Sequence, residues 1–118
     1  MKNMNETIER YTSAWNEKTI QDVKAAFADI LANEITYQDK NTPLVTGMEA
    51  FVDLVMLSHD KVPGRTFSLS GEPEYFDHHC FYSWKINIPG HGEFAGKDYV
   101  EYNDENKLTK IIGFVPTL

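Results

Sequence analysis

The stretch Phe94–Tyr102, F-A-G-K-D-Y-V-E-Y, alternates between two kinds of side chain, and the rest of the chain can be interpreted outward from it. Alternation with period two is typical of a strand with one face in the interior and one toward water. Asp98 falls on the apolar face, whereas Lys97 and Glu101 fall on the polar one. Because burying an ionised carboxyl without partners is costly, we expect Asp98 to be paired, hydrogen-bonded or protonated. This carboxyl is the strongest functional signal in the sequence.

Length and composition indicate one acidic, globular domain over residues 1–118. A chain of 118 residues with 42% hydrophobic content can bury a single core without disulfides or a metal ion. The net charge of -7 argues against nucleic acid and against an anionic membrane surface as partners. The single cysteine, Cys80, and the lack of a signal-peptide core or a membrane-spanning apolar run together predict a cytoplasmic protein.

Helical periodicity in the first half of the chain predicts three helices. Ile8, Tyr11 and Trp15 recur at the spacing of one helical face. A second helix is expected to begin at Thr19, and T-G-M-E at 46–49 reads as a capping box for a third. The apolar faces of the second and third helices are expected to carry Val23, Ala26, Phe27, Ile30 and Leu31, and then Phe51, Leu54, Val55 and Ser58.

Strand periodicity begins at residues 34–39, where Asp39 shares the parity of Tyr37. Residues 41–43 are expected to form a loop before the third helix, and everything after Gly64 reads as antiparallel strands. Three helices, one early strand and a four-stranded meander predict an α+β fold, with a curved sheet wrapped over the helices.

Four short motifs accompany this order of elements: R-Y at 10–11, Y-Q-D at 37–39, T-G-M-E at 46–49 and K-D-Y-V-E-Y-N-D-E-N-K-L at 97–108. Together they resemble the nuclear transport factor 2-like superfamily, which includes the SnoaL-like polyketide cyclases and the ketosteroid isomerases. The resemblance covers nearly the whole chain. It implies a cystatin-like cone, in which three N-terminal helices cap a strongly curved, mostly antiparallel sheet around a deep apolar pocket. It also implies a homodimer through the outer face of the sheet, where we expect Phe81, Tyr99 and Ile111.

The isomerase branch of that superfamily implies three catalytic positions in this chain. Its general base, at the end of the first strand, falls on Asp39. The tyrosine and aspartic acid of its oxyanion hole fall on Tyr11 and Asp98. The departures from the isomerase pattern concern the substrate more than the type of chemistry, and one of them is a longer segment between Trp15 and Leu31. Lys40 stands where the isomerases tend to have proline, and Val55 stands where they have a supporting tyrosine.

These three residues suit acid–base chemistry on a carbonyl compound. A carboxylate in an apolar pocket loses hydration, which favours its taking a proton from a carbon acid, and Asp39 is the expected base. Tyr11 and a neutral Asp98 would then donate hydrogen bonds to the enolate oxygen, as in ketosteroid isomerase. The sequence thus predicts an isomerase, cyclase or dehydratase that uses no cofactor. A small, planar, hydrophobic molecule is expected to contact Trp15, Phe27, Leu31, Tyr37, Phe51, Val55, Tyr82, Trp84, Phe94, Val100 and Phe114.

Each catalytic candidate also has a purely structural interpretation. Asp39 could cap the loop at 40–43, since aspartate is a common turn former. Asp98 could hydrogen-bond Trp84 Nε1, a tyrosine or the backbone as a satisfied buried group. Tyr11 could be an ordinary core aromatic. A ligand-binding or protein-interaction domain of the same fold without turnover therefore stays open.

A metal site is not expected in this chain. His78, His79 and Cys80 are adjacent and have no distant partner in the sequence, which is poor spacing for zinc. A solvated turn explains the two histidines, and a small buried packing residue explains Cys80.

Overall fold

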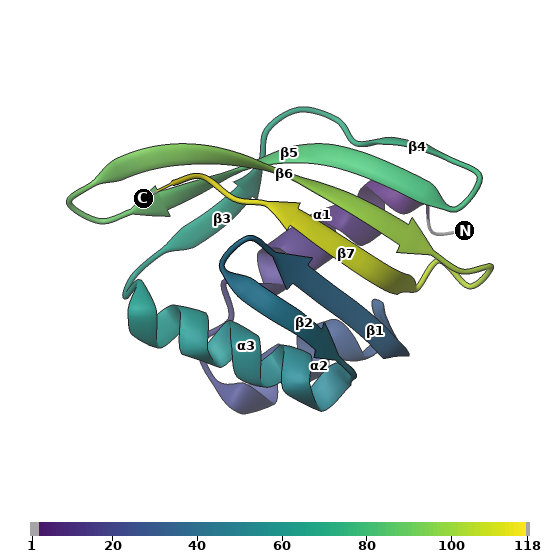
Figure 1. The fold of residues 1–118 in the computed structure, drawn as a ribbon, viewed down its shortest axis with the longest axis horizontal. Helices are drawn as coiled ribbons and strands as arrows, with labels where there is room; N and C mark the ends of the chain where they lie inside the picture. Colours follow the sequence, from purple (N-terminus) through teal and green to yellow (C-terminus); the bar gives the residue numbers. More distant parts are fainter. Residues whose placement is uncertain (1–2, 118) are drawn as a thin grey trace.

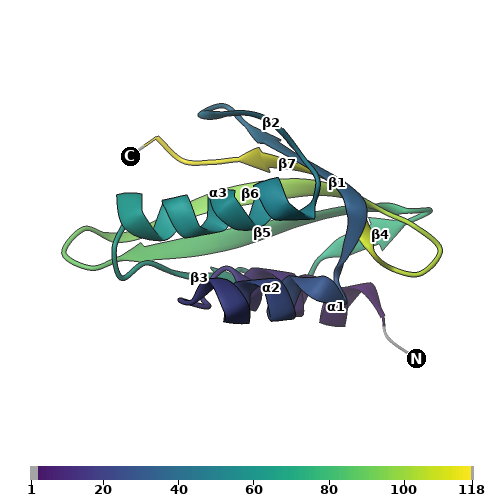
Figure 2. The same ribbon diagram turned by 90° about the horizontal axis from the view of Figure 1, so that it is seen from below.

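The computed structural model describes residues 3–117, in which three helices pack on one curved, seven-stranded sheet (Figures 1 and 2). The elements in chain order are α1 (Met4–Ala14), α2 (Ile20–Ala28), β1 (Leu31–Asp39), β2 (Thr42–Thr46), α3 (Met48–Lys61), β3 (Thr66–Leu69), β4 (Glu74–Phe76), β5 (His79–Ile88), β6 (Gly92–Tyr102) and β7 (Leu108–Phe114). The predicted α+β class is confirmed. None of the helices within residues 3–117 is long and apolar enough to cross a membrane.

The sheet places the last strand of the sequence near its middle. The strand order is β2-β1-β7-β6-β5-β3, and β4 pairs with β5 beside this path. β1 and β7 run parallel, whereas the other pairs are antiparallel. The sheet is therefore mostly antiparallel, as predicted. Because β7 pairs with both β1 and β6, it brings the strand of Asp39 close to the strand of Asp98.

The alternation read from the sequence places side chains correctly in the two longest strands. In β6, Asp98 and Val100 are buried and Lys97 is exposed. In β5, every second residue from Cys80 to Ile88 is buried. The two strands pair along their whole length, with Tyr82 opposite Asp98. Asp98 thus enters the interior on the same face as the apolar residues.

The helices close the concave side of the sheet through aromatic contacts. Phe27 of α2 and Phe51 of α3 meet at 90°, with ring centroids 5.1 Å apart, and neither ring is exposed. The ring of Tyr11 in α1 lies 5.8 Å from Phe27 and 6.3 Å from Phe51. The edge-to-face contact between Phe27 and Phe51 adds to the free energy gained from burying the rings. This cluster fixes the three helices against one another.

The second helix ends earlier than its apolar pattern predicted. Thr19 caps it as expected, accepting a hydrogen bond from the backbone N–H of Asp22. However, α2 stops at Ala28, and Leu31 is the first residue of β1. Leu31 pairs with Leu108 of β7, so sheet formation prevails over helical spacing there. Both residues are buried, which the helical stripe could not distinguish from a strand start.

The loop predicted at 41–43 and the predicted capping box at 46–49 are wrong. Thr42–Thr46 forms β2, which pairs with β1. Thr46 therefore lies in a strand, and Gly47 is the N-cap of α3 without a side-chain hydrogen bond. The N–H of Gly47 donates to the carbonyl of Ile35 in β1 at 2.8 Å. Its φ of +93° is accessible to glycine at little cost, which allows the chain to leave the sheet and enter the helix at once.

The expected place of Ile111 on the outer sheet face is also wrong. Ile111 is fully buried, and its neighbour Ile112 takes the outer side. The register between β6 and β7 shifts near Glu101 and Tyr102, so the alternation in β7 changes phase. A phase change by one residue moves side chains to the opposite face.

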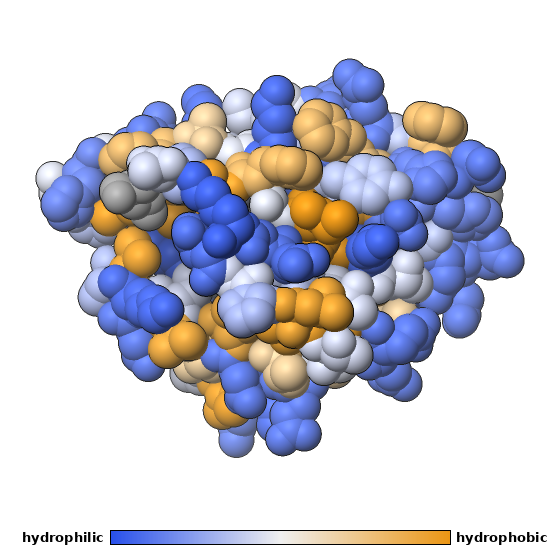
Figure 3. Space-filling model, viewed as in Figure 1, coloured by the Kyte–Doolittle hydropathy of each residue, from blue (hydrophilic) through white to orange (hydrophobic). Residues whose placement is uncertain are grey.

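The molecular surface is unevenly polar. In the space-filling view, hydrophobic side chains gather along the middle of the face shown, and its right-hand end is mostly hydrophilic (Figure 3).

Candidate functional site

A cavity of about 380 Å³ lies between the sheet and helices α1 and α3. Its walls are aromatic, with Trp15 at the C-cap of α1, Tyr37 from β1, Phe67 from β3 and Trp84 from β5. It is bordered by the β1–β2 turn, by the C-terminal half of α3 and by residues 115–117 after β7, segments that lie near one another in Figure 1. The volume is near the lower end of the range for small-molecule sites, about 300–1,000 Å³.

The three residues expected to be catalytic all line this cavity. Tyr11 comes from α1, Asp39 from the end of β1, and Asp98 from the middle of β6. Gly113 of β7 shows how near the two carboxyl groups are. A Cβ atom built on Gly113 would lie 3.4 Å from Asp98 Oδ1 and 3.4 Å from Asp39 Cβ. Both aspartates therefore border the same small space.

Asp98 is buried at the inner end of the cavity, with 7% of its surface exposed. Tyr82 donates a hydrogen bond to Oδ2 at 2.6 Å, and Trp84 Nε1 donates to Oδ1 at 3.0 Å. Burial raises the pKa of Asp98 to about 6, although these two hydrogen bonds oppose the rise and the charge of Asp39 adds to it. The carboxyl can therefore gain or lose a proton near physiological pH.

Asp39 is half-buried and lies closer to solvent than Asp98. Tyr37 donates a hydrogen bond to Oδ2 at 2.7 Å, and the backbone N–H of Asn41 donates to Oδ1 at 2.8 Å. The hydrogen bond from Asn41 gives Asp39 the turn-capping role that was one of the interpretations of the sequence. The same carboxylate borders the cavity, so capping and a chemical role are compatible.

Three phenols around the carboxyl groups remain hydrogen-bond donors. Burial raises the pKa of Tyr11 well above its ordinary value, and the charge of Asp98 raises it further. Burial has the same effect on the pKa values of Tyr37 and Tyr82. Of the three, Tyr37 and Tyr82 already donate to the aspartates. Tyr11 is thus the phenol best placed to donate to a bound molecule.

Several solved structures have the same arrangement of elements. A proposed isomerase of the SnoaL-like family from Agrobacterium tumefaciens superposes with a TM-score of 0.85 at 23% identity, covering 94% of this chain and 95% of that one. A proposed SnoaL-like polyketide cyclase from Jannaschia has a TM-score of 0.74 at 11% identity, with coverage of 94% and 84%. A nuclear transport factor 2-like protein from Cytophaga hutchinsonii has a TM-score of 0.72 at 11% identity, with coverage of 98% and 92%.

This chain has the nuclear transport factor 2-like fold. The finding confirms the fold implied by the sequence motifs. No protein-family model matches the sequence, and no curated protein does so either. At identities of 23% and below, these structures establish the fold and leave the chemistry to be argued from the site.

Within residues 3–117 of this nuclear transport factor 2-like fold, the cavity is lined by only some of the residues that were expected to contact the ligand. Trp15, Tyr37 and Trp84 line it. The buried residues that lie in the core instead are Phe27, Leu31, Phe51, Val55, Tyr82 and Val100. Phe94 packs partly buried against the core, and Phe114 is 58% exposed on the outer side of β7. Phe114 follows the phase change that also displaced Ile111.

A glycine in β6 explains how Trp84 reaches Asp98. Gly96 is the cross-strand partner of Trp84, and a Cβ atom there would lie 2.3 Å from Cζ2 of the indole. Only a residue without a side chain allows the indole to lie across the strand. The sequence carried this signal, because a glycine inside an alternating strand often marks a close approach.

A buried arginine that the sequence did not single out supports the cavity wall. Arg65 is 2% exposed, and its Nη1 donates to the carbonyl of Trp15 at 2.8 Å. Its Nε donates to Ser58 Oγ at 2.8 Å, and its guanidinium lies 4.8 Å from the ring centroid of Phe67. Burial lowers the pKa of Arg65 to about 10, so it stays charged at neutral pH. Arg65 holds three lining residues, Trp15, Ser58 and Phe67, in place.

The border of the cavity contains residues that periodicity could not reveal. Lys40 and Lys61 line it from the β1–β2 turn and from the end of α3. Lys40 Nζ donates to Thr117 Oγ1 at 2.7 Å. The sequence showed only that Lys40 follows Asp39. It gave no sign that residues 115–117 fold back beside it.

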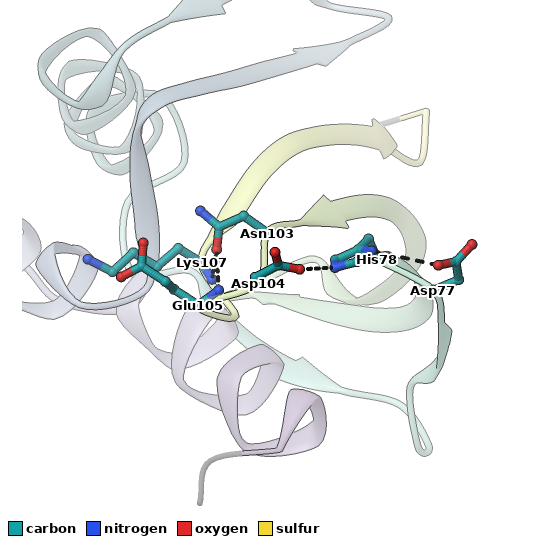
Figure 4. A network of polar contacts seen from close by, with 6 residues as sticks. All are labelled: Asp77, His78, Asn103, Asp104, Glu105 and Lys107. Carbon is teal, nitrogen blue, oxygen red and sulfur yellow. Dashed lines mark hydrogen bonds and ion pairs between the residues drawn. The ribbon is translucent and has the colours of Figure 1, made fainter.

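His78 belongs to a turn network away from the cavity (Figure 4), whereas His79 is the first residue of β5 rather than part of the turn, and its Nδ1 lies 2.7 Å from the hydroxyl of Tyr99. His78 Nε2 lies 2.7 Å from Asp104 Oδ1, which links the β4–β5 turn to the β6–β7 hairpin. Asn103 Oδ1 shapes that hairpin by accepting hydrogen bonds from the backbone N–H groups of Glu105 and Lys107. No group of three metal-ligating side chains occurs within residues 3–117.

Cys80 is a buried free cysteine. Burial raises the pKa of its thiol to about 12, so the thiol stays protonated.

Proposed function

We propose that the cavity binds a small, largely hydrophobic carbonyl compound and catalyses proton transfer through an enolate. The observation that carries the proposal is the meeting of Tyr11, Asp39 and Asp98 at one aromatic-walled cavity. General acid–base chemistry requires such groups within reach of one bound molecule. The names of the Agrobacterium and Jannaschia structures, an isomerase and a polyketide cyclase, support the same class of reaction.

In the proposed reaction, the Asp39 carboxylate removes a proton from the carbon next to the carbonyl. The electron pair of that C–H bond forms a carbon–carbon double bond, and the carbonyl oxygen becomes the enolate oxygen. Asp39 then returns the proton to a different carbon, which completes an isomerisation with no net gain or loss of protons. An aldol-type cyclisation or a dehydration would use the same enolate.

Tyr11 and the neutral form of Asp98 are proposed to donate hydrogen bonds to the enolate oxygen. The raised pKa of Tyr11 keeps its phenol protonated. With a pKa of about 6, Asp98 is mostly ionised at neutral pH, and about one molecule in ten carries the proton at pH 7. The proposed donor form of Asp98 therefore becomes the main one only below pH 6.

The test is to measure isomerisation of a β,γ-unsaturated ketone by ultraviolet absorbance with the wild-type chain and with Asp39→Asn. We expect the substitution to lower kcat by about a hundredfold or more, since it removes the base. Glu34→Gln is the matched control, because Glu34 is an exposed carboxylate of the same strand. Unchanged turnover in Asp39→Asn would remove Asp39 from the role of base.

A second candidate function is ligand binding without turnover, and one observation favours it. All four carboxylate oxygens of Asp39 and Asp98 already accept hydrogen bonds from the protein. Such satisfied groups also occur for purely structural reasons. Saturable binding of ketones with no turnover above the uncatalysed rate would support this candidate over the first.

We also propose a homodimer through the outer sheet face and a cytoplasmic location. Phe81 and Phe114 are 42% and 58% exposed on the outer side of β5 and β7. Tyr99 lies between these strands on β6, opposite Phe81. Exposed apolar patches of this kind are often covered by a partner. The buried free thiol of Cys80 suits a reducing compartment.

A further inference from the structure

The charged residues that line the cavity differ in exposure, the acidic ones being buried or half-buried and the basic ones exposed. Among the described lining residues, four carry a formal charge: Asp39, Asp98, Lys40 and Lys61. Asp98 is buried, and Asp39 is half-buried. Both lysines are exposed, Lys40 in the β1–β2 turn and Lys61 at the end of α3. A molecule in the cavity would thus meet acidic groups that are buried or half-buried and ammonium groups that are exposed.

The two lysines have no ion-pair partner among the described side chains. No ion pair joins Lys40 or Lys61 to a carboxylate anywhere in residues 3–117. The one hydrogen bond of Lys40 Nζ goes to the uncharged hydroxyl of Thr117. The chain has 18 acidic and 11 basic residues, so acidic partners are in excess. Two lysines without such an ion pair therefore border one cavity, and their ammonium groups can donate hydrogen bonds to an anionic group there.

We infer that the ligand of this cavity carries an anionic end group, a carboxylate, held at the border between Lys40 and Lys61. This inference rests on the proposed function, whose substrate class it narrows. The carbonyl end of the ligand is neutral and lies at Asp39 and Asp98. The opposite orientation is disfavoured, because it would bury an anion beside two acidic groups.

The lysines act on orientation and selectivity more than on total affinity. Exposed charge pairs contribute little each, so the aromatic walls supply most of the binding. The effect of the two lysines is to orient the ligand, so that its carbonyl group rather than its charged end contacts Tyr11. The ligand is then an amphipathic keto acid with a short apolar body, in keeping with a cavity of about 380 Å³.

The cavity itself supplies the means to test this. The chain has two tryptophans, Trp15 and Trp84, and both line the cavity. Intrinsic fluorescence therefore reports on occupancy directly, with no need for turnover. Two probes of matched shape are 4-phenylbutyrate and 4-phenylbutyramide, which differ in the end group, a charged carboxylate in the first and a neutral amide in the second.

The experiment measures the Kd of both probes by fluorescence in three proteins: wild type, the double variant Lys40→Gln/Lys61→Gln and the double variant Lys24→Gln/Lys110→Gln. The last is the matched control, because Lys24 and Lys110 are exposed and do not line the cavity, while the change in net charge is the same. In the wild type at low salt we expect the carboxylate to bind about fivefold more tightly than the amide. Added salt should reduce this preference.

The preference should disappear in Lys40→Gln/Lys61→Gln and persist in the control. Equal binding of the two probes to the wild type would overturn the inference, and so would a preference that survives in Lys40→Gln/Lys61→Gln. An absence of saturable binding by either probe would overturn it as well. A failure of the proposed catalysis would look different: the carboxylate preference would be intact, and no ketone would be turned over.

Discussion

Gly113 lies directly opposite Asp98 in the β6–β7 pair, and a Cβ atom at position 113 would lie 3.0 Å from the hydroxyl oxygen of Tyr37. The same Cβ would lie 3.4 Å from Asp98 Oδ1. Neither Tyr37 nor Asp98 can move freely, because Tyr37 is hydrogen-bonded to Asp39 and Asp98 is hydrogen-bonded to Trp84. The missing side chain at Gly113 therefore keeps open the space between the two carboxyl groups.

The first prediction concerns Gly113→Ala. The added methyl group should push Tyr37 away from Asp39 or displace Asp98. We expect turnover to fall about tenfold or more, since small misplacements of catalytic groups are costly. The free energy of unfolding should fall by about 1–3 kcal/mol from overpacking. Steady-state kinetics and urea unfolding measure the two effects. Ala95→Ser, at an exposed position of β6, should change neither, and a Gly113→Ala protein with wild-type kinetics would contradict the prediction.

The second prediction concerns stability against pH. The pKa of Asp98 is about 6 in the folded chain against an ordinary value of 3.8, so the folded state binds the proton more tightly than the unfolded state. The free energy of unfolding should therefore decrease as pH rises from about 4 to 6, with about 3 kcal/mol arising from this group. Urea unfolding across this range measures the slope.

Asp98→Asn should abolish that part of the slope, because an amide does not titrate. Asp53→Asn is the control, since Asp53 is an exposed carboxylate on α3. A slope of equal size in Asp98→Asn and in the wild type would show that another group is responsible.

The third prediction concerns the rate of the proposed isomerisation. If neutral Asp98 donates to the enolate oxygen, kcat should rise about tenfold from pH 7 to about pH 5, as the carboxyl gains its proton. A pH–rate profile measures it directly. A rate that falls with acidification through pH 6 would instead identify Asp98 as the base.

The fourth prediction concerns Arg65→Met. The substitution removes the hydrogen bonds to the carbonyl of Trp15 and to Ser58 Oγ, two partly buried acceptors. We expect the free energy of unfolding to fall by about 2–4 kcal/mol, and probe binding to weaken because Trp15 loses its support. Arg10→Met is the control, since Arg10 is only partly buried and its carboxylate partner lies 4.0 Å away. Its loss should cost less than about 1 kcal/mol. Equal losses in the two variants would contradict the role given to Arg65.

The fifth prediction concerns the proposed homodimer. Replacing the exposed Phe81 and Phe114 with serine should shift sedimentation from dimer to monomer at micromolar concentration, while the fold is kept. Leu57→Ser is the control, because Leu57 is also exposed but lies on α3. A wild-type chain that sediments as a monomer over the whole concentration range would refute the dimer.

The sequence predicted the face of a strand residue well wherever the ladder is regular. Tyr82, Trp84 and Asp98 all point inward as their parity required. It failed at the register shift beside Tyr102, because a bulge leaves no clear mark in the alternation. Ile111 and Phe114 were misplaced for that single reason.

For the candidate site, the sequence could name the acidic groups but not the full lining. Asp39 and Asp98 stood out because a carboxylate on an apolar face is anomalous. Phe27 and Phe51 are equally aromatic, yet they pack on each other and fill the core instead. Whether a ring borders a cavity depends on long-range packing, which periodicity does not encode. Residues 115–117 were missed because an irregular segment has no period at all.

The central position of β7 has a consequence for how the molecule is made. While the ribosome is still synthesising the chain, β1 and β6 emerge without the strand that joins them, since β7 follows both in sequence and pairs with both. The parallel contact with β1 spans most of the chain, and such non-local contacts form slowly. The two acidic groups should thus be separate in any partly synthesised chain and become neighbours only when β7 inserts.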